Sequence, residues 1–242
     1  MSTKTVLWFF AATAMCGSAF VHAQYRSARF NMLIRTGAEV PLHPESFMQY
    51  WRPSAGAGAE LVWFVSGRTG ITLGAYANPF TIDRGQWTDA LEPKLEGAGR
   101  LAFEKGTCTV YTAAIGLRRV FPITDRPFSF FVRAAGEYAN VYQKNLQVST
   151  VFPSATLKQD IRVAQSATAW GGCIGLGTEL RLSKRWWLGF DAAVHYIAIE
   201  RDPYPSNDRL IRIMLPPDAQ GKGFATVSLE WVYAFGFASP GP

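Results

Sequence analysis

Apolar and polar residues alternate with a period of two along several segments of the chain. The clearest of these is VSLEWVYAFGF, residues 227–237, in which one set of alternate positions is apolar or aromatic and the other holds smaller residues and Glu230. Successive side chains of a β-strand point to opposite faces, so the pattern predicts a strand with two different faces. A soluble sheet would turn the aromatic face towards a core, whereas a transmembrane barrel would turn it towards lipid.

The same alternation recurs in seven earlier segments. These segments are residues 25–40, 55–65, 71–80, 108–121, 127–142, 166–182 and 185–199. Together with the closing segment they predict an all-β fold, an antiparallel transmembrane barrel of about eight strands.

The connections between these segments alternate between short and long. The short ones are SGRT (66–69), PITDRP (122–127) and SKR (183–185). The long, polar ones lie near residues 41–53, 80–106, 143–163 and 201–222. Short turns at one end and long loops at the other are typical of outer-membrane barrels, and a soluble sandwich has no reason to sort its connections in this way.

The small-residue face carries isolated charges of both signs. They are Arg35, Glu60, Arg118, Arg133, Glu137, Glu179, Arg181, Asp191 and Glu230. If the aromatic sets formed a soluble core, this face would be the surface and would carry many more charged residues. Charges of both signs instead suit a narrow lumen, where ionised groups must pair to offset their desolvation. The sequence therefore predicts a lumen plugged by a charge network.

The aromatic face is then predicted to meet lipid. The residues expected there are Trp63, Phe130, Trp186, Leu188, Trp231 and Phe235. The rings expected in the aromatic girdles at the two membrane interfaces are Trp63, Tyr138, Trp186, Tyr196 and Trp231.

The N-terminus predicts export. Lys4 precedes the apolar run VLWFFAATA, and the small-residue site VHA follows at 21–23. These features predict a signal peptide over residues 1–23 and a single barrel domain over residues 24–242. The alternative, a membrane anchor, needs about 20 apolar residues, more than this run contains.

Composition narrows the remaining options. The chain has 242 residues and a formal charge of +6, which becomes +5 once Lys4 is removed with the signal peptide. An exported chain without a clustered basic helix is not expected to bind nucleic acid. Cys108 and Cys173 are too few for a disulfide scaffold, and the sequence leaves open whether they form a bridge.

The run GLGTELRLSKRWWLGFDAAVHY, residues 175–196, resembles the strand, turn and strand of small bacterial outer-membrane barrels of the OmpA/OmpX type. The alternating last strand resembles the signal that their assembly machinery recognises. The resemblance implies location in the cell outer membrane. The partners it implies are outer-membrane lipids, lipopolysaccharide and the assembly machinery.

Some small barrels are lipid-modifying enzymes, and His195 with Asp191 on the same face raises that alternative here. Ile197 stands two residues on, where such an enzyme would place a serine, and nucleophilic catalysis needs that hydroxyl within hydrogen-bond reach. We therefore expect a lumen histidine bonded to a neighbouring carboxylate. The sequence predicts no enzyme and no catalytic, cofactor-binding or metal-binding residue.

Two other functions stay open. One is a structural or surface-interaction barrel that acts through its long loops. The other is a small channel or carrier for small or hydrophobic molecules. The lumen charges favour the first, because about five carboxylates and four arginines can cross-link one another and close the pore. Any recognition is then expected in the long loops, which contain the rings of Phe47, Tyr50 and Trp51 and the alternating run LIRIML at 210–215; the alternative is that these rings only dip into the outer leaflet.

Overall fold

The computed structural model describes residues 30–43, 48–49, 51–91, 100–123, 126–152, 155–161, 165–183, 185–198 and 224–237. The predicted signal peptide, residues 1–23, and the run LIRIML lie outside the described residues. So do Phe47 and Tyr50 of the first long loop.

The described residues form one antiparallel sheet of ten strands with a short helix. The elements are β1 (Phe30–His43), β2 (Trp51–Arg52), β3 (Ser54–Phe64), β4 (Thr69–Ile82), α3 (Arg84–Leu91), β5 (Arg100–Pro122), β6 (Phe128–Phe152), β7 (Ala155–Ile161), β8 (Gln165–Arg181), β9 (Trp186–Ala198) and β10 (Phe224–Phe237). Without the two-residue β2 and the branch strand β7, eight strands remain, in the order β4-β3-β1-β10-β9-β8-β6-β5.

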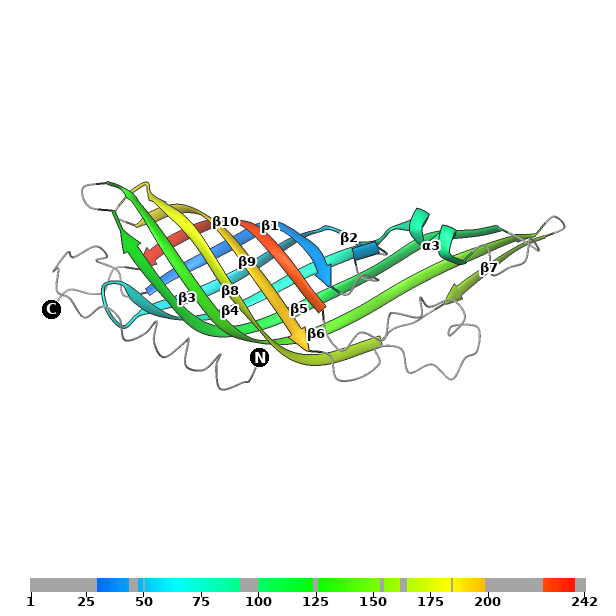
Figure 1. Cartoon of the computed structure of the whole chain (residues 1–242), viewed down its shortest axis with the longest axis horizontal. Helices are drawn as coiled ribbons and strands as arrows, with labels where there is room; N and C mark the ends of the chain where they lie inside the picture. Colours follow the sequence, from blue (N-terminus) through cyan, green and yellow to red (C-terminus); the bar gives the residue numbers. More distant parts are fainter. Residues whose placement is uncertain are drawn as a thin grey trace.

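These eight strands close into a barrel (Figure 1). The last strand pairs with the first, Phe30 with Phe237 through Val40 with Val227, and β4 pairs with β5 along the opposite side. Closure leaves each of the eight strands with a neighbour on both sides, as lipid requires, because hydrocarbon offers no partner to a free backbone amide or carbonyl. The predicted fold class and strand number are confirmed.

The short connections are tight turns at one end of the barrel. In the turn between β3 and β4, the amides of Val65 and Ser66 both donate to Thr69 O, and Thr69 N donates back to Ser66 Oγ at 3.1 Å. The turn between β8 and β9 repeats this pattern, with Leu182 N and Ser183 N donating to Trp186 O. A serine at the first corner satisfies local amides in both turns.

The two faces of the sheet are divided as the sequence predicts. Apolar side chains of the outer face stay exposed, for example Leu73 (60%), Ile115 (64%) and Leu176 (66%), while Arg35 and Asp191 of the inner face are fully buried. This arrangement reverses that of a soluble domain and matches a barrel whose outer surface contacts lipid. No helix in the described part of the chain is long and apolar enough to cross a membrane.

All six residues predicted to face lipid lie on the outer face. Trp63, Phe130, Trp186 and Trp231 are exposed. Leu188 and Phe235 are half-buried, and Phe235 owes this to the ring of Trp186, which packs edge-on at a centroid distance of 4.1 Å.

The aromatic residues of the outer face cluster towards both ends of the barrel. Trp63 and Trp186 lie near the short turns, whereas Tyr138 packs on Trp170 nearer the long loops. Trp231, which the sequence predicts for a girdle, instead packs on Phe190 between the two groups by its register, because its place in the middle of β10 keeps it away from either end of the barrel.

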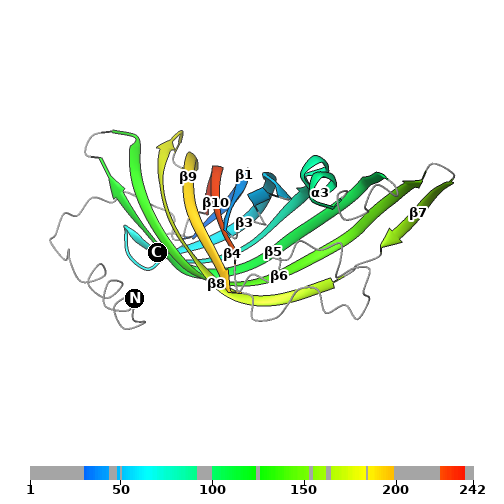
Figure 2. The same ribbon diagram turned by 45° about the vertical axis from the view of Figure 1, so that its right-hand side comes forward.

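The long loops contain more sheet than the sequence predicted. β5 already begins at Arg100, β6 continues to Phe152, and β7 pairs with the end of β6, so much of the regions expected to be loops at 80–106 and 143–163 is strand. Figure 2 shows this extension of β5, β6 and β7 projecting beyond the other strands. Polar composition predicts loops in these regions. A hairpin outside the membrane can nevertheless hold polar residues on both faces and still complete its backbone pairing.

Arginine on the outer face should destabilise the barrel according to depth. Leu176→Arg places a cation in the middle of β8 and should reduce the free energy of unfolding by about 2–4 kcal/mol. Leu182→Arg, just beyond the end of the same strand and also exposed, should cost at most about 1 kcal/mol, because its cation reaches the interface. Urea unfolding in phospholipid vesicles measures both. Equal losses for the two variants would contradict the assignment of the outer face to lipid.

Candidate functional site

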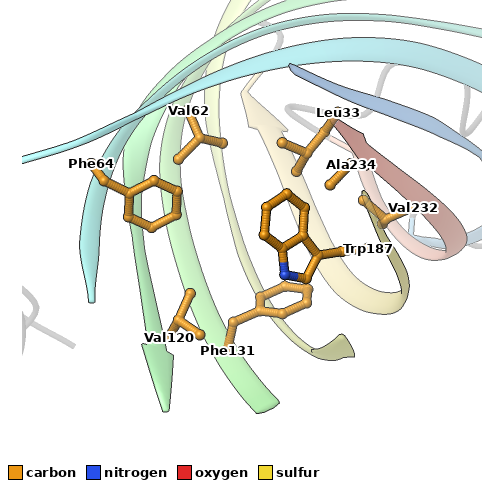
Figure 3. Close-up of a cluster of buried hydrophobic side chains, with 8 residues drawn as sticks. All are labelled: Leu33, Val62, Phe64, Val120, Phe131, Trp187, Val232 and Ala234. Carbon is orange, nitrogen blue, oxygen red and sulfur yellow. The ribbon is translucent and has the colours of Figure 1, made fainter. Parts of the chain in front are cut away.

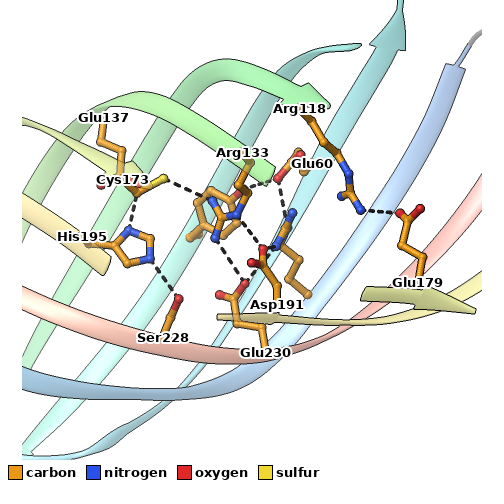
Figure 4. Close-up of polar contacts among 12 residues, drawn as sticks. Glu60, Arg118, Arg133, Glu137, Cys173, Glu179, Asp191, His195, Ser228 and Glu230 are labelled. Carbon is orange, nitrogen blue, oxygen red and sulfur yellow. Dashed lines mark hydrogen bonds and ion pairs between the residues drawn. The ribbon is translucent and has the colours of Figure 1, made fainter. Parts of the chain in front are cut away.

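Five charged side chains from five strands meet in the middle of the lumen, and we name them the central network: Arg35, Glu60, Arg133, Asp191 and Glu230 (Figure 4). Arg35 Nε lies 3.0 Å from Glu60 Oε2, and its Nη1 lies 3.1 Å from Glu230 Oε2. The same Nη1 donates to Asp191 Oδ2, which also accepts from Arg133 Nε at 2.6 Å. The charges predicted for the lumen are therefore paired with one another across the barrel.

Glycines make room for long side chains in the lumen. Gly175 of β8 pairs with Arg133, and a Cβ at Gly58 of β3 would clash with the ring of Tyr76, whose hydroxyl donates to Glu60 Oε2. A Cβ at Gly175 would lie 3.0 Å from both Arg133 Nε and Asp191 Oδ1. The small residues that alternate with apolar ones in the sequence thus give the network its space.

A second ion pair lies closer to the short turns. Arg118 of β5 bonds to Glu179 of β8, and the guanidinium carbon of Arg118 lies 3.6 Å from the centre of the Phe131 ring. Both charged side chains are buried. The pair adds a further layer of filled lumen below the central network.

An apolar layer fills the lumen at the short-turn end (Figure 3). Its members are Leu33, Val62, Phe64, Val120, Phe131, Trp187, Val232 and Ala234. The ring of Phe131 joins this layer to the ion pair above it, because it packs under Arg118.

Arg181 does not join these layers, although the sequence placed it among the lumen charges. Its Nε donates to Ser183 O at 3.2 Å in the turn after β8. Arg181 is the last residue of its strand, so its side chain reaches the backbone of the turn.

On the other side of the central network, towards the long loops, lies a group that we name the histidine cluster: Glu137, Cys173, His195 and Ser228. His195 Nδ1 lies 2.9 Å from Glu137 Oε1, and its Nε2 lies 3.0 Å from Ser228 Oγ. Arg133 Nη1 donates to Cys173 Sγ at 3.2 Å, which links this cluster to the central network.

The expectation of a lumen histidine bonded to a carboxylate is confirmed, but Asp191, the possible partner on the same strand face, does not supply that carboxylate. Residues four apart on a strand are separated by about 13 Å, so Asp191 lies a layer away and bonds to the two arginines. The carboxylate comes from Glu137 on β6. The serine that local spacing did not supply comes from β10, as Ser228, so contacts between strands rather than spacing within one strand could have revealed both partners.

Ser228, His195 and Glu137 stand in the order of a nucleophile, a base and an orienting acid. Ser228 is only 4% exposed, however, and a substrate carbonyl would have to reach its hydroxyl. The geometry permits proton sharing within the cluster, and the absence of enzymatic activity stays a prediction.

Cys108 and Cys173 are free thiols, so the disulfide that the sequence left open is not formed. The two residues lie on β5 and β8, which β6 separates. Both are buried.

A pocket of about 390 Å³ lies at the long-loop end, lined by Arg52, Thr81, Ile82, Arg84, Gly106 and Thr107. Asp83 shapes its rim, since Arg52 Nε donates to Asp83 Oδ2 at 3.2 Å and the amide of Gln86 donates to Asp83 Oδ1 at the start of α3. These hydrogen bonds lower the pKa of Asp83 below its ordinary value. The pocket presents two guanidinium groups and two threonines.

Removing the central arginine should cost far more than removing a surface one. Arg35→Met removes one cation from the buried carboxylates Glu60 and Asp191 and from the half-buried Glu230, and it should reduce the free energy of unfolding by about 3–5 kcal/mol. Arg52→Met breaks the exposed ion pair with Asp83 and should cost at most about 1 kcal/mol. Urea unfolding in vesicles compares the two variants, and similar losses would mean that the central network contributes no more than a surface pair.

No protein-family model matches the chain, and no curated protein matches its sequence. Among solved structures, the chain is similar to Neisserial surface protein A, with 7% identity, a TM-score of 0.45 and coverage of 87% of this chain and 98% of that one. It is also similar to Ail, the attachment invasion locus protein of Yersinia pestis, with 10% identity, a TM-score of 0.42 and coverage of 86% and 99%. A third is the outer membrane protein OprG from Pseudomonas aeruginosa, with 13% identity, a TM-score of 0.42 and coverage of 89% and 99%.

Identities this low concern the fold alone. The protein's own geometry is that of a small outer-membrane barrel: the sheet is closed and antiparallel, the outer face is apolar with aromatic groups towards both ends, and the charges are turned inwards. Such barrels reside in the cell outer membrane of bacteria.

Proposed function

We propose that this protein is a surface-interaction barrel with a closed lumen, and that it binds its partners at the long-loop end. The observation that carries the proposal is the filled lumen, in which successive layers of side chains are buried. A closed lumen leaves the surfaces beyond the membrane as the place for recognition.

The burial of these layers argues against a continuous water path. Arg35 and Asp191 of the central network and Val62 of the apolar layer each have 0% exposure. Opening a path would require these buried charges to separate, which is costly because each would lose its partner without regaining full hydration. A channel or carrier is therefore the less favoured function.

The extension of β5, β6 and β7 offers one surface for recognition. On the side of β6 away from β5, β7 pairs with β6 from Leu146 with Ile161 to Phe152 with Ala155. In the part of the chain that the structure describes, the outer edge of β7 pairs with no further strand. Such an edge accepts an added strand from a partner protein through its backbone groups.

The pocket at the base of this extension offers a second surface, suited to an anionic group. Arg52 and Arg84 supply guanidinium donors, and Thr81 and Thr107 supply hydroxyls. Guanidinium groups recognise phosphate in a planar, two-pronged geometry. At the loop end of an outer-membrane barrel, the phosphates of lipopolysaccharide are the nearest ligands of this chemistry.

The closed lumen predicts an absence of conductance. Refolded protein, checked by its heat-modifiable mobility in gels, should give no stable current steps in planar bilayers. The double variant Phe131→Ala with Trp187→Ala removes two of the three rings of the apolar layer and serves as a comparison with a weakened seal. Large, stable steps from the unmodified protein would overturn the closed lumen and favour the channel.

The pocket predicts a charge-dependent affinity for lipopolysaccharide. Arg52→Ala with Arg84→Ala should weaken binding about tenfold or more, because one hydrogen bond between charged groups is worth at least about 1.5 kcal/mol. Arg68→Ala with Arg126→Ala removes the same charge at the short-turn end and should leave binding unchanged. Binding to lipopolysaccharide and to its dephosphorylated form, measured at low and high salt, tests this. Equal weakening by both double variants would show that overall charge, not the pocket, is responsible.

A further inference from the structure

We propose that Glu137, Cys173 and His195 form a binding site for a divalent transition metal of the zinc class inside the lumen. Each residue offers one ligand atom, and these atoms all lie within 4.8 Å of one another. The proposal is independent of the proposed function, because it requires neither a closed lumen nor a loop-end partner.

Three neighbouring strands hold the ligands in place. Cys173 of β8 pairs directly with His195 of β9, and it pairs on its other side with Ala135 of β6, two residues before Glu137. All three ligands therefore project from the inner face of one continuous stretch of sheet, whose pairing fixes their spacing. A site on paired strands is more rigid than one on loops.

The set of donors selects the metal. A thiolate, an imidazole and a carboxylate are the ligands that zinc uses, and three protein ligands leave a fourth tetrahedral position for water. Calcium and magnesium prefer oxygen ligands alone, so a thiol and an imidazole disfavour them. The thiolate and the carboxylate would together balance the two positive charges of the ion, so that a neutral unit is buried.

The surroundings of the ligands suit a bound metal. With Nδ1 of His195 as the metal ligand, Nε2 would carry the hydrogen and donate to Ser228 Oγ, 3.0 Å away, as the second ring nitrogen of a metal-ligating histidine usually does. Arg133 Nη1, 3.2 Å from Cys173 Sγ, can donate a hydrogen bond to a metal-bound sulfur. Glu137 Oε2 is buried without a hydrogen-bond partner, which leaves this oxygen available to a cation.

The same histidine could instead act as a catalytic base towards Ser228, but access separates the two uses. Catalysis needs room for a substrate next to the buried hydroxyl, whereas a metal site needs room for one ion. The side chain of His195 is 13% exposed, whereas the side chain of its partner Glu137 is 0% exposed. The observations favour the metal.

The test uses the full chain without a histidine tag, refolded in detergent and checked by heat-modifiable mobility. Cobalt replaces zinc as a spectroscopic probe, since a cobalt–thiolate bond gives a charge-transfer absorption in the near ultraviolet. The unmodified protein should show this absorption, lose it on addition of zinc, and retain about one zinc per chain after dialysis. Absence of both the absorption and retained zinc from the unmodified protein would overturn the proposal without any variant.

Matched variants locate the site. Cys173→Ser should abolish the cobalt–thiolate absorption, whereas Cys108→Ser, the other buried thiol, should retain it. His195→Gln should weaken zinc binding about tenfold or more, whereas His43→Gln, an exposed histidine at the end of β1, should not. The two cysteine variants and the two histidine variants are separate comparisons. If a variant in one comparison fails to fold, the other comparison still tests the site. Loss of the absorption in Cys108→Ser, or its retention in Cys173→Ser, would place the metal elsewhere and contradict the site.

Discussion

The structure depends on closure of the sheet, which follows from the absence of hydrogen-bond partners in lipid. Every backbone amide and carbonyl at membrane depth must be paired within the protein, and a sheet meets this condition only when its first and last strands join. With eight strands the enclosed space is just wide enough for side chains to fill. The side chains on the inner face of the sheet therefore form the core of the protein. Many of these core side chains are charged.

An ionic core limits what the lumen can tolerate. The central network has two arginines and three carboxylates, and each arginine bonds to carboxylates of more than one strand. Pairing of this kind stabilises little compared with well-packed apolar side chains, yet loss of a single partner is expensive. The ionic layer also differs from the apolar layer at the short turns, because its directional bonds join particular strands across the lumen as well as filling space.

The sequence predicts the fold better than the site, for a physical reason. Alternation of side chains along a strand is a local property, so the outward position of Trp63 and the inward position of Arg133 follow from sequence alone. Contacts across the lumen depend on register and barrel geometry, so the choice of Glu137 over Asp191 as the partner of His195 does not. The same limit applies to the extension of β5, β6 and β7, because outside lipid the polar face of a strand is indistinguishable from a loop by composition.

The position of Arg35 bears on the order in which the barrel can be assembled. Arg35 belongs to the first strand, while Asp191 and Glu230 belong to the last two, so two of its three carboxylate partners exist only once almost the whole chain has been synthesised. Strands that pair one after another would leave Arg35 bonded to Glu60 of β3 alone until β10 meets β1. Joining of the seam thus completes the ionic contacts of Arg35 late, and a half-built sheet with partly paired lumen charges is poorly suited to the hydrocarbon, which couples insertion to completion of the barrel.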